Sequence, residues 1–418
     1  MTRTIEGNDD LMRTVWETVH RTPVTDIHTH IYTPAHGGLL LWGIDELLTY
    51  HYLIAEVFRY APLPYDEWWA LSKAEQAEYV WRHVFLEHSP VSEAARGVLT
   101  SLGLLGLDPA SRDLETYRSY FAATTPSAHV DTVLERANVS CAVMTNDPFD
   151  DEERPLWQED ADALRHPRFR TALRVDKLLV DWKGAVKCLK AWGYEVKDSC
   201  DKASRAEVCR FLEDWVDILD PLYVAASLPD DFAVERKTKM TKVLKDCIIR
   251  VARERNLPVA MMIGVKRQVN PALRLAGDAV GKADVDQVMQ LCADHPDVKF
   301  LVTMLSRENQ HELCIAARKF PNLMIFGCWW FLNDPETIVE ITNMRTELLG
   351  LSYIPQHSDA RVLDQVLYKW AHSRWLIAQC LQKKYADLVR TGWVLSVDEI
   401  ERDVRGLLGG NFWDFLAR

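Results

Sequence analysis

Residues 23–30 read Pro23-Val24-Thr25-Asp26-Ile27-His28-Thr29-His30, a short run that ends in two histidines one residue apart. The pattern predicts a β-strand, in which side chains repeat with a period of two, so His28 and His30 point to the same face. Two imidazoles at the C-terminal end of one strand supply half of a metal site. Such a pair also occurs where histidines only pack or face solvent, so the interpretation depends on the rest of the chain.

The composition bounds the class of protein. The chain has 418 residues, 48% hydrophobic and 26% charged, which is usual for a globular protein with a large core. Its formal net charge of −12 argues against a nucleic-acid partner and against an anionic membrane surface. No apolar run approaches the about 20 residues that cross a membrane, and residues 1–10 are polar with no apolar signal segment. The nine cysteines form no CxxC pair, so we expect a soluble protein of a reducing compartment, the cytoplasm.

Short apolar runs recur along the second two thirds of the chain. They lie at residues 141–145, 169–174, 222–227, 259–264, 300–304, 323–327 and 351–355, and helical patterns such as 237–256, 285–295 and 309–320 separate most of them. Nearly continuous apolar runs are typical of strands buried on both faces of a parallel sheet. Together with the strand that ends at His28, they predict an α/β fold, a (β/α)₈ or TIM barrel. An open doubly wound sheet, with the first and last strands apart, is the alternative.

Helical patterns alone fill the chain between the first two predicted strands. They lie at residues 45–60, 66–87, 92–105, 114–122 and 130–137, so we expect residues 32–137 to be a helical insertion after the first strand. A helix is also expected at 11–20, and the chain ends in helical patterns at 360–390 and 397–407. No repeat or low-complexity linker marks a boundary, which predicts a single domain over residues 1–418. Barrels of this size commonly self-associate, and we expect a homo-oligomer.

Asp359 follows the eighth predicted strand. Reactive residues of a (β/α)₈ barrel lie after the C-terminal ends of its strands, and closure makes the eighth strand a neighbour of the first. Asp359 is therefore expected to meet His28 and His30. Two histidines and one carboxylate with an open position form a catalytic zinc arrangement, and Mn²⁺ or Fe²⁺ tolerates the same ligands. The alternative for Asp359 is an N-cap on the helix predicted at 360–390.

Five short motifs occur in order along the chain: His28-Thr29-His30, His51-Tyr52, Arg174-Val175-Asp176, Trp329-Trp330-Phe331 and Asp359-Ala360-Arg361. They resemble the signature positions of the uronate isomerases, a branch of the amidohydrolase superfamily. The resemblance covers essentially the whole chain, including the helical insertion. It implies interconversion of D-glucuronate with D-fructuronate and of D-galacturonate with D-tagaturonate, so the expected partner is a small-molecule uronate.

The residues suit this reaction, which moves a proton between C2 and C1 through an enediol. Arg174 is the candidate for the substrate carboxylate, because its planar guanidinium suits bidentate contact; an internal ion pair with Asp147 or Asp176 is the alternative. Arg361 is expected to stabilise developing negative charge. The metal is expected to polarise the carbonyl and hydroxyl oxygens.

Asp359 and Tyr52 are both candidates for the base. A tyrosine has a reference pKa of about 10, so Tyr52 would need a nearby cation to act as a phenolate. His51 and Tyr52 are consecutive on a predicted helix, so we expect one to enter the site while the other supports it. Trp329 and Trp330 are expected to wall the sugar and exclude water. A structural role is the alternative for His51 and for both tryptophans.

The chain also departs from the family pattern. Many uronate isomerases carry a histidine after the fifth strand, where this chain has Met262, and residues 303–307 after the sixth strand contain none. We therefore expect one metal, with Lys266, Arg267 or Arg307 as candidates for contacts near the fifth strand.

Two other functions compete with isomerisation. One is a metal-dependent hydrolase of the same superfamily, and the missing histidines weigh against it. The other is a non-catalytic sugar-acid binding protein, against which the complete set of His28, His30 and Asp359 argues.

Overall fold

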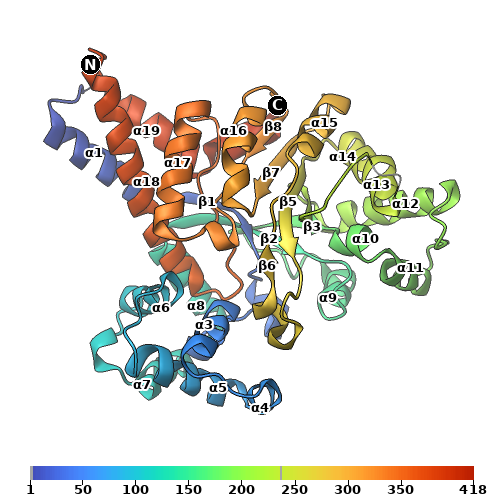
Figure 1. Ribbon diagram of the computed structural model, residues 1–418, viewed down its shortest axis with the longest axis horizontal. Helices are drawn as coiled ribbons and strands as arrows, with labels where there is room; N and C mark the ends of the chain where they lie inside the picture. The colour runs from blue at the N-terminus through green and yellow to red at the C-terminus, as the bar shows by residue number, and fades with distance from the viewer. Residues whose placement is uncertain (1–2, 236–237) are drawn as a thin grey trace.

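The computed structural model describes residues 3–235 and 238–418, and its centre is a curled sheet of seven parallel strands (Figure 1). In chain order, and each beside the next, these are β1 (Val24–Thr29), β2 (Val139–Asn146), β3 (Phe169–Arg174), β4 (Val224–Pro229), β5 (Val259–Lys266), β7 (Phe300–Met304) and β8 (Leu323–Ile325). A further short strand, β6 (Ala279–Val280), pairs antiparallel with the end of β5. The first seven predicted strands are therefore confirmed.

Both faces of the curled sheet are buried, as the continuous apolar runs predicted. Each of the seven strands contributes a side chain to a small inner cluster that includes Ile27, Val143, Ala172, Ala225, Ala260, Leu301 and Met324. The residues that alternate with these pack outward against the helices in the large outer core. A parallel sheet that curls has an inner face, filled by its own side chains, and an outer face that packs against helices.

The eighth predicted strand, at 351–355, is wrong. Only one isolated bridge forms there, between Phe326 and Ile354. Beyond this bridge the oxygen of Gly327 accepts from the side chain of Arg345 at 2.7 Å. The amide of Cys328 donates to the side chain of Gln356 at 2.8 Å, so side chains take the place of further strand pairing. The chain then reaches the other edge of the sheet, where the Asp359 amide donates to the oxygen of His28 at 3.2 Å.

Helices cover the outer face of the sheet, and short 3₁₀ or π turns, labelled η, connect some of them. Outside the segment between β1 and β2, the helices and turns are α1 (Asn8–Arg21), α9 (Glu153–Asp160), α10 (Asp176–Val180), α11 (Trp182–Ala191), α12 (Lys202–Leu219), α13 (Lys239–Val243), η4 (Leu244–Ile248), α14 (Ile249–Glu254), η5 (Pro271–Gly277), α15 (Asp286–Asp294), η6 (Arg307–Asn309), α16 (Gln310–Ala317), η7 (Trp330–Leu332), α17 (Pro335–Leu349), α18 (Gln365–Arg390), α19 (Val397–Arg405), η8 (Gly406–Gly410) and α20 (Asn411–Ala417). The helix predicted at 237–256 corresponds to α13, η4 and α14, and its first residue lies outside the described residues. No described helix is both long and apolar enough to cross a membrane.

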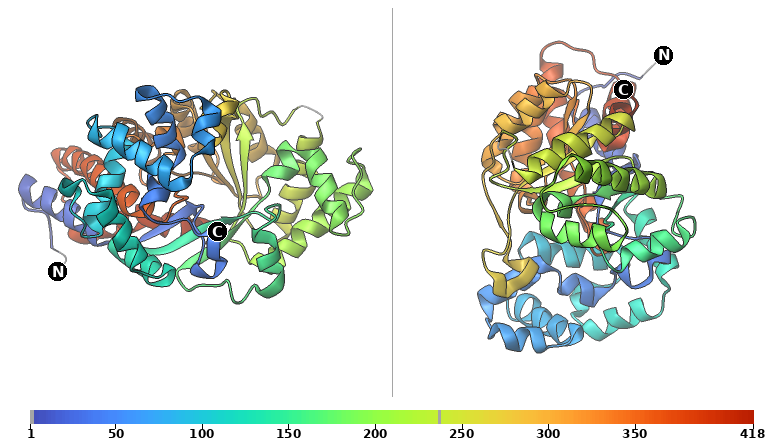
Figure 2. Two further views of the ribbon diagram at one scale, coloured as in Figure 1. Left: turned by 90° about the horizontal axis from the view of Figure 1, so that it is seen from below. Right: turned by 90° about the vertical axis from the view of Figure 1, so that its right-hand side faces the viewer.

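The segment between β1 and β2 is helical throughout and gathers at the end of the sheet where the strands terminate (Figures 1 and 2). It contains η1 (Pro34–Leu39), α2 (Ile44–Leu48), α3 (His51–Tyr60), α4 (Tyr65–Ala70), α5 (Lys73–Val80), η2 (Trp81–Leu86), α6 (Glu93–Leu104), η3 (Pro109–Ser111), α7 (Leu114–Ala122) and α8 (Pro126–Arg136). The single helix predicted at 45–60 breaks at Tyr50, whose backbone is extended with φ −65° and ψ 142°. The one predicted at 66–87 breaks at Ser72, which begins α5 with a capping box to Glu75.

Two further differences from the prediction affect the site. The helix predicted from residue 360 begins at Gln365, so Asp359 is not its N-cap. No sequence pattern indicated the hairpin formed by residues 267–278 after β5, which contains η5 and packs against α3. The indole of Trp69 donates to the oxygen of Ala272 at 2.8 Å and attaches this hairpin to the helical segment.

Candidate metal centre and active site

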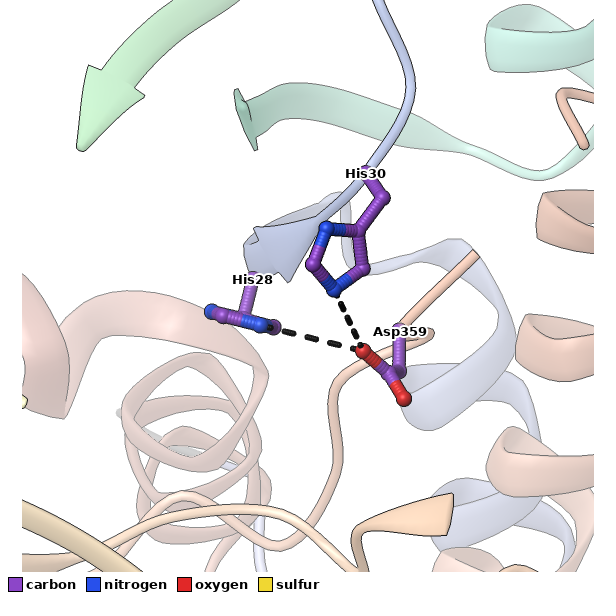
Figure 3. A group of neighbouring side chains, drawn as sticks. All are labelled: His28, His30 and Asp359. Atoms are coloured by element: carbon purple, nitrogen blue, oxygen red, sulfur yellow. Dashed lines mark ion pairs between the residues drawn. The ribbon is translucent and has the colours of Figure 1, made fainter. Parts of the chain in front are cut away.

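His28, at the end of β1, His30, just beyond it, and Asp359, between β8 and α18, form one cluster (Figure 3). The Oδ1 atom of Asp359 lies 3.7 Å from Nε2 of His28 and 3.3 Å from Nε2 of His30. The two imidazole rings stand nearly perpendicular, at 88°. The structure thus brings together the three residues that the sequence proposed as metal ligands.

The backbone fixes Asp359 beside β1. Its amide donates to the oxygen of His28, and the amide of His30 donates to the oxygen of Ala360 at 2.7 Å. Asp359 has a φ of +50°, an uncommon conformation that aspartate tolerates better than most residues and that clusters at functional sites. One carboxylate oxygen therefore faces both imidazoles, and the other points away from them (Figure 3).

The cluster fits a divalent cation. Burial, and after it the neighbouring His30, lowers the pKa of His28 to about 3, and burial lowers the pKa of His30 well below its usual value. Both imidazoles are therefore neutral at pH 7. Nε2 of His28 and Oδ1 of Asp359 are buried without a hydrogen-bond partner among the described residues. Unpartnered nitrogens facing a carboxylate oxygen are the donor set of a catalytic zinc site.

A cavity of about 30 Å³ adjoins this cluster. Seven of the nine predicted site residues line it, namely His30, His51, Arg174, Trp329, Trp330, Asp359 and Arg361. Arg267, a candidate for contacts near the fifth strand, also lines it, together with four residues that were not assigned to the site: Tyr50, Ser227, Met262 and Leu275.

The two predicted arginines differ in their partners. Arg174 forms the ion pair that was its alternative, with its Nη2 2.6 Å and its Nε 3.0 Å from Asp176 Oδ2. Asp176 raises the pKa of Arg174 above its usual value. Arg361 also lines the cavity, but none of the described acceptors binds its guanidinium. Arg361 is therefore a cation whose charge is available to a bound anion.

The helical segment delivers Tyr50 and His51 to the cavity, because the break before α3 turns the chain toward the sheet. His51 has a buried Nε2 without a partner among the described residues, and burial, followed by Arg361, lowers its pKa to about 3. Tyr52 is not a lining residue. It packs behind Tyr50, with the ammonium of Lys369 5.5 Å from its ring centre. Burial raises the pKa of Tyr52 well above its usual value, so the phenol is neutral.

The remaining candidates are the two tryptophans and the three cations proposed near the fifth strand. Trp329 is only 4% exposed, and Trp330 has a buried Nε1 without a described partner. Of the cations near the fifth strand, only Arg267 lines the cavity. Lys266 pairs with Asp230 at 3.4 Å, and Arg307 pairs with Glu340 at 2.8 Å.

His357 is a residue that the sequence did not single out. It is 1% exposed, its ring centre lies 5.4 Å from that of His28, and neither ring nitrogen has a described partner. The signal that could have found it is its position just after the eighth predicted strand, two residues before Asp359.

Comparison with known proteins assigns the chain to a family. No family model and no curated protein matches it. Among solved structures, a uronate isomerase from Bacillus halodurans C-125 is 53% identical, with a TM-score of 0.96, and the match covers 99% of this chain and 98% of the other. A uronate isomerase from Thermotoga maritima (15% identity, TM-score 0.78, 99% and 100% covered) and a glucuronate isomerase from Caulobacter crescentus (16% identity, TM-score 0.76, 100% and 95% covered) share the fold. With half of its residues identical over the full length of the first of these structures, the chain belongs to the uronate isomerase family.

Proposed function

We propose that the chain interconverts aldose and ketose uronates: D-glucuronate with D-fructuronate, and D-galacturonate with D-tagaturonate. The observation that carries this proposal is the 53% identity over 99% of the chain with a uronate isomerase. The cavity supports it, since a carboxylate, three arginines and two tryptophans surround one space. Nothing specific favours the hydrolase, because the described cavity lining contains no histidine from β5 or β7.

We propose zinc as the cation, held by His28, His30 and Asp359; Mn²⁺ or Fe²⁺ suits the same ligands. When bound, the cation would act as a Lewis acid that polarises the carbonyl and hydroxyl oxygens of the substrate. Asp359 has a second oxygen directed away from the imidazoles (Figure 3). We assign to that oxygen the transfer of the proton between C2 and C1.

The remaining residues bind the substrate. Arg361 opposes the negative charge that develops on the enediol oxygen. Arg174, with Asp176 fixing its Nε and Nη2, offers Nη1 to the substrate carboxylate. Trp329 and Trp330 cover the sugar and exclude water, and the imidazole of His51 binds a hydroxyl. Tyr52, which is neutral and behind Tyr50, is the weaker candidate for the base.

We also propose that the curled sheet is a (β/α)₈ barrel whose eighth strand is reduced to residues 354–360. The bridge at Ile354 and the amide of Asp359 contact the two edge strands and support this assignment. Residues 32–137 are then an insertion on the first βα loop of a single domain over residues 1–418.

Product chromatography tests the proposed function. The purified protein, loaded with Zn²⁺, should convert D-glucuronate or D-galacturonate to the corresponding ketose. Asp359→Asn should lower kcat by at least about a thousandfold, since it removes a ligand and the base together. Asp113→Asn is the matched control, because Asp113 is an N-cap on α7 that asparagine also satisfies. Absence of both ketoses with the wild-type protein would contradict the proposal.

A further inference from the structure

We propose that Tyr223 and Thr145 are positioning residues of the metal centre: their hydroxyl groups select the tautomers of His28 and His30 in which both Nε2 atoms carry lone pairs. The inference rests on the cation site of the proposed function. It concerns two side chains, just before β4 and near the end of β2, that no motif identified.

At His28 the hydrogen-bond directions follow from the acceptor. The hydroxyl of Tyr223 lies 2.6 Å from the main-chain oxygen of Ile27 and 3.2 Å from Nδ1 of His28. A carbonyl oxygen only accepts, so the single phenolic hydrogen is donated to Ile27. The contact with His28 is then a hydrogen bond only if Nδ1 carries the hydrogen. The tautomer with a free lone pair on Nε2 is the one that satisfies both contacts.

The same arrangement recurs at His30. The hydroxyl of Thr145 lies 2.8 Å from the main-chain oxygen of Thr29 and 2.8 Å from Nδ1 of His30. Again the carbonyl takes the hydroxyl hydrogen, and Nδ1 donates its own hydrogen to the hydroxyl oxygen. In both cases the hydroxyl binds the carbonyl of the residue that precedes the histidine it orients.

Burial makes these two hydroxyls hard to replace by solvent. Tyr223 is 2% exposed and Thr145 is 3% exposed. With Nδ1 of each ring occupied, the Nε2 atoms face Asp359 Oδ1 with no hydrogen between them. Such hydrogen bonds behind a ligating histidine fix its orientation, and their loss typically weakens metal binding.

Metal affinity, measured without substrate, tests the inference. We expect Tyr223→Phe and Thr145→Val each to raise the Kd for Zn²⁺ by about 10- to 100-fold in competition with a chromophoric chelator. The double variant should show roughly the product of the two effects, because each hydroxyl acts on a different imidazole. The visible absorption of the Co²⁺-loaded protein should change in both single variants. Thr145→Ser keeps the hydroxyl and should restore the Kd to within about threefold of wild type.

Matched controls separate positioning from general destabilisation. Tyr353→Phe and Thr171→Val remove buried hydroxyls that also donate to main-chain oxygens, those of Thr342 and Leu219, away from the cluster. They should leave the Kd unchanged. A loss below tenfold in Tyr223→Phe and Thr145→Val, or an equal loss in the controls, would overturn the inference. So would a wild-type protein that binds none of Zn²⁺, Mn²⁺ and Fe²⁺. A wild-type protein that binds metal but forms no ketose would instead overturn the proposed function.

Discussion

Gly327 allows the buried ring of His357 to pack against the main chain beside the metal centre. Its φ is +66°, which favours glycine, and a Cβ atom there would lie 1.7 Å from Nδ1 of His357. The fully buried Arg345 donates to the oxygen of Gly327 at 2.7 Å and holds the peptide in place. The ring of His357 is 1% exposed, so it lies in the packed interior against this peptide.

We therefore predict that Gly327→Ala lowers the free energy of unfolding by about 2–5 kcal/mol, the sum of a left-handed backbone and an overpacked core. Gly37→Ala is the control, since its φ is +59° but no atom lies within 4 Å of the added Cβ. It should lose only the backbone part, about 1–2 kcal/mol. Urea unfolding of both variants measures the difference, and equal losses would show that His357 does not restrict this position.

The sequence predicts some of these residues and not others for physical reasons. His28, His30 and Asp359 follow from the period of a strand and from the adjacency of the first and last strands, which are properties of the chain itself. Tyr50 depends on a helix break, and Tyr223 on a contact across the sheet. Neither contact has a local pattern, so only the structure reveals them.

Among the elements, the hairpin of residues 267–278 contributes two side chains, Arg267 and Leu275, to the cavity lining. It places Arg267 at the cavity and pairs it with the buried Asp278 at 2.6 Å. The stacking of Arg274 on Trp69, at 4.0 Å, attaches the hairpin to the helical segment. The hairpin therefore joins the sheet and the helical segment at the site.

Arg267→Met should raise the KM for uronates by about tenfold or more and change kcat less, because it removes a cation of the cavity lining that we expect to contact the substrate in the ground state and transition state alike. Arg307→Met, which removes a cation paired with Glu340 outside the cavity lining, should leave both constants unchanged. Steady-state kinetics on the two variants distinguishes them. Equal behaviour would remove Arg267 from the substrate site.

The elements differ in how far the sequence determines them. Seven strands were predictable because strands buried on both faces are continuous apolar runs. The eighth failed because the side chains of Arg345 and Gln356 bind the main chain of residues 327 and 328 in place of a paired strand. The helix predicted at 45–60 divides at Tyr50, and the hairpin after β5 rests on tertiary contacts with Trp69, so propensity did not indicate either feature.

For the molecule as a whole, buried histidines link stability to pH. Burial lowers the pKa of His36 to about 4 and that of His372 to about 4, from 6.5 in the unfolded chain. Each stays neutral in the folded protein while the unfolded chain takes up a proton. Their contribution to the free energy of unfolding is complete above pH 6.5 and is lost as the pH falls from 6.5 toward 4.

The free energy of unfolding should therefore decrease between pH 7 and pH 4.5, because each of these histidines contributes up to about 1.4 kcal/mol for every tenfold change in proton concentration across this range. His36→Gln should flatten this dependence, whereas His88→Gln, at an exposed position, should not. Urea titrations of the metal-free proteins at the two pH values provide the comparison. An unchanged slope in His36→Gln would mean that His36 titrates alike in the folded and unfolded chains.

Two properties of the whole molecule stay predictions. The first is the cytoplasmic location, which was predicted from the sequence pattern alone. All nine cysteines are free thiols in the described structure. Self-association also stays a prediction, which the mass of the purified protein in solution would test.

The most direct test of uronate isomerisation is proton NMR of the Zn²⁺-loaded protein with D-glucuronate in D₂O. The proposed mechanism predicts ketose signals, with deuterium entering at C1 or C2, and neither change with Asp359→Asn. An unchanged spectrum with D-glucuronate, and again with D-galacturonate, would contradict the assignment of this chain as a uronate isomerase that acts by proton transfer.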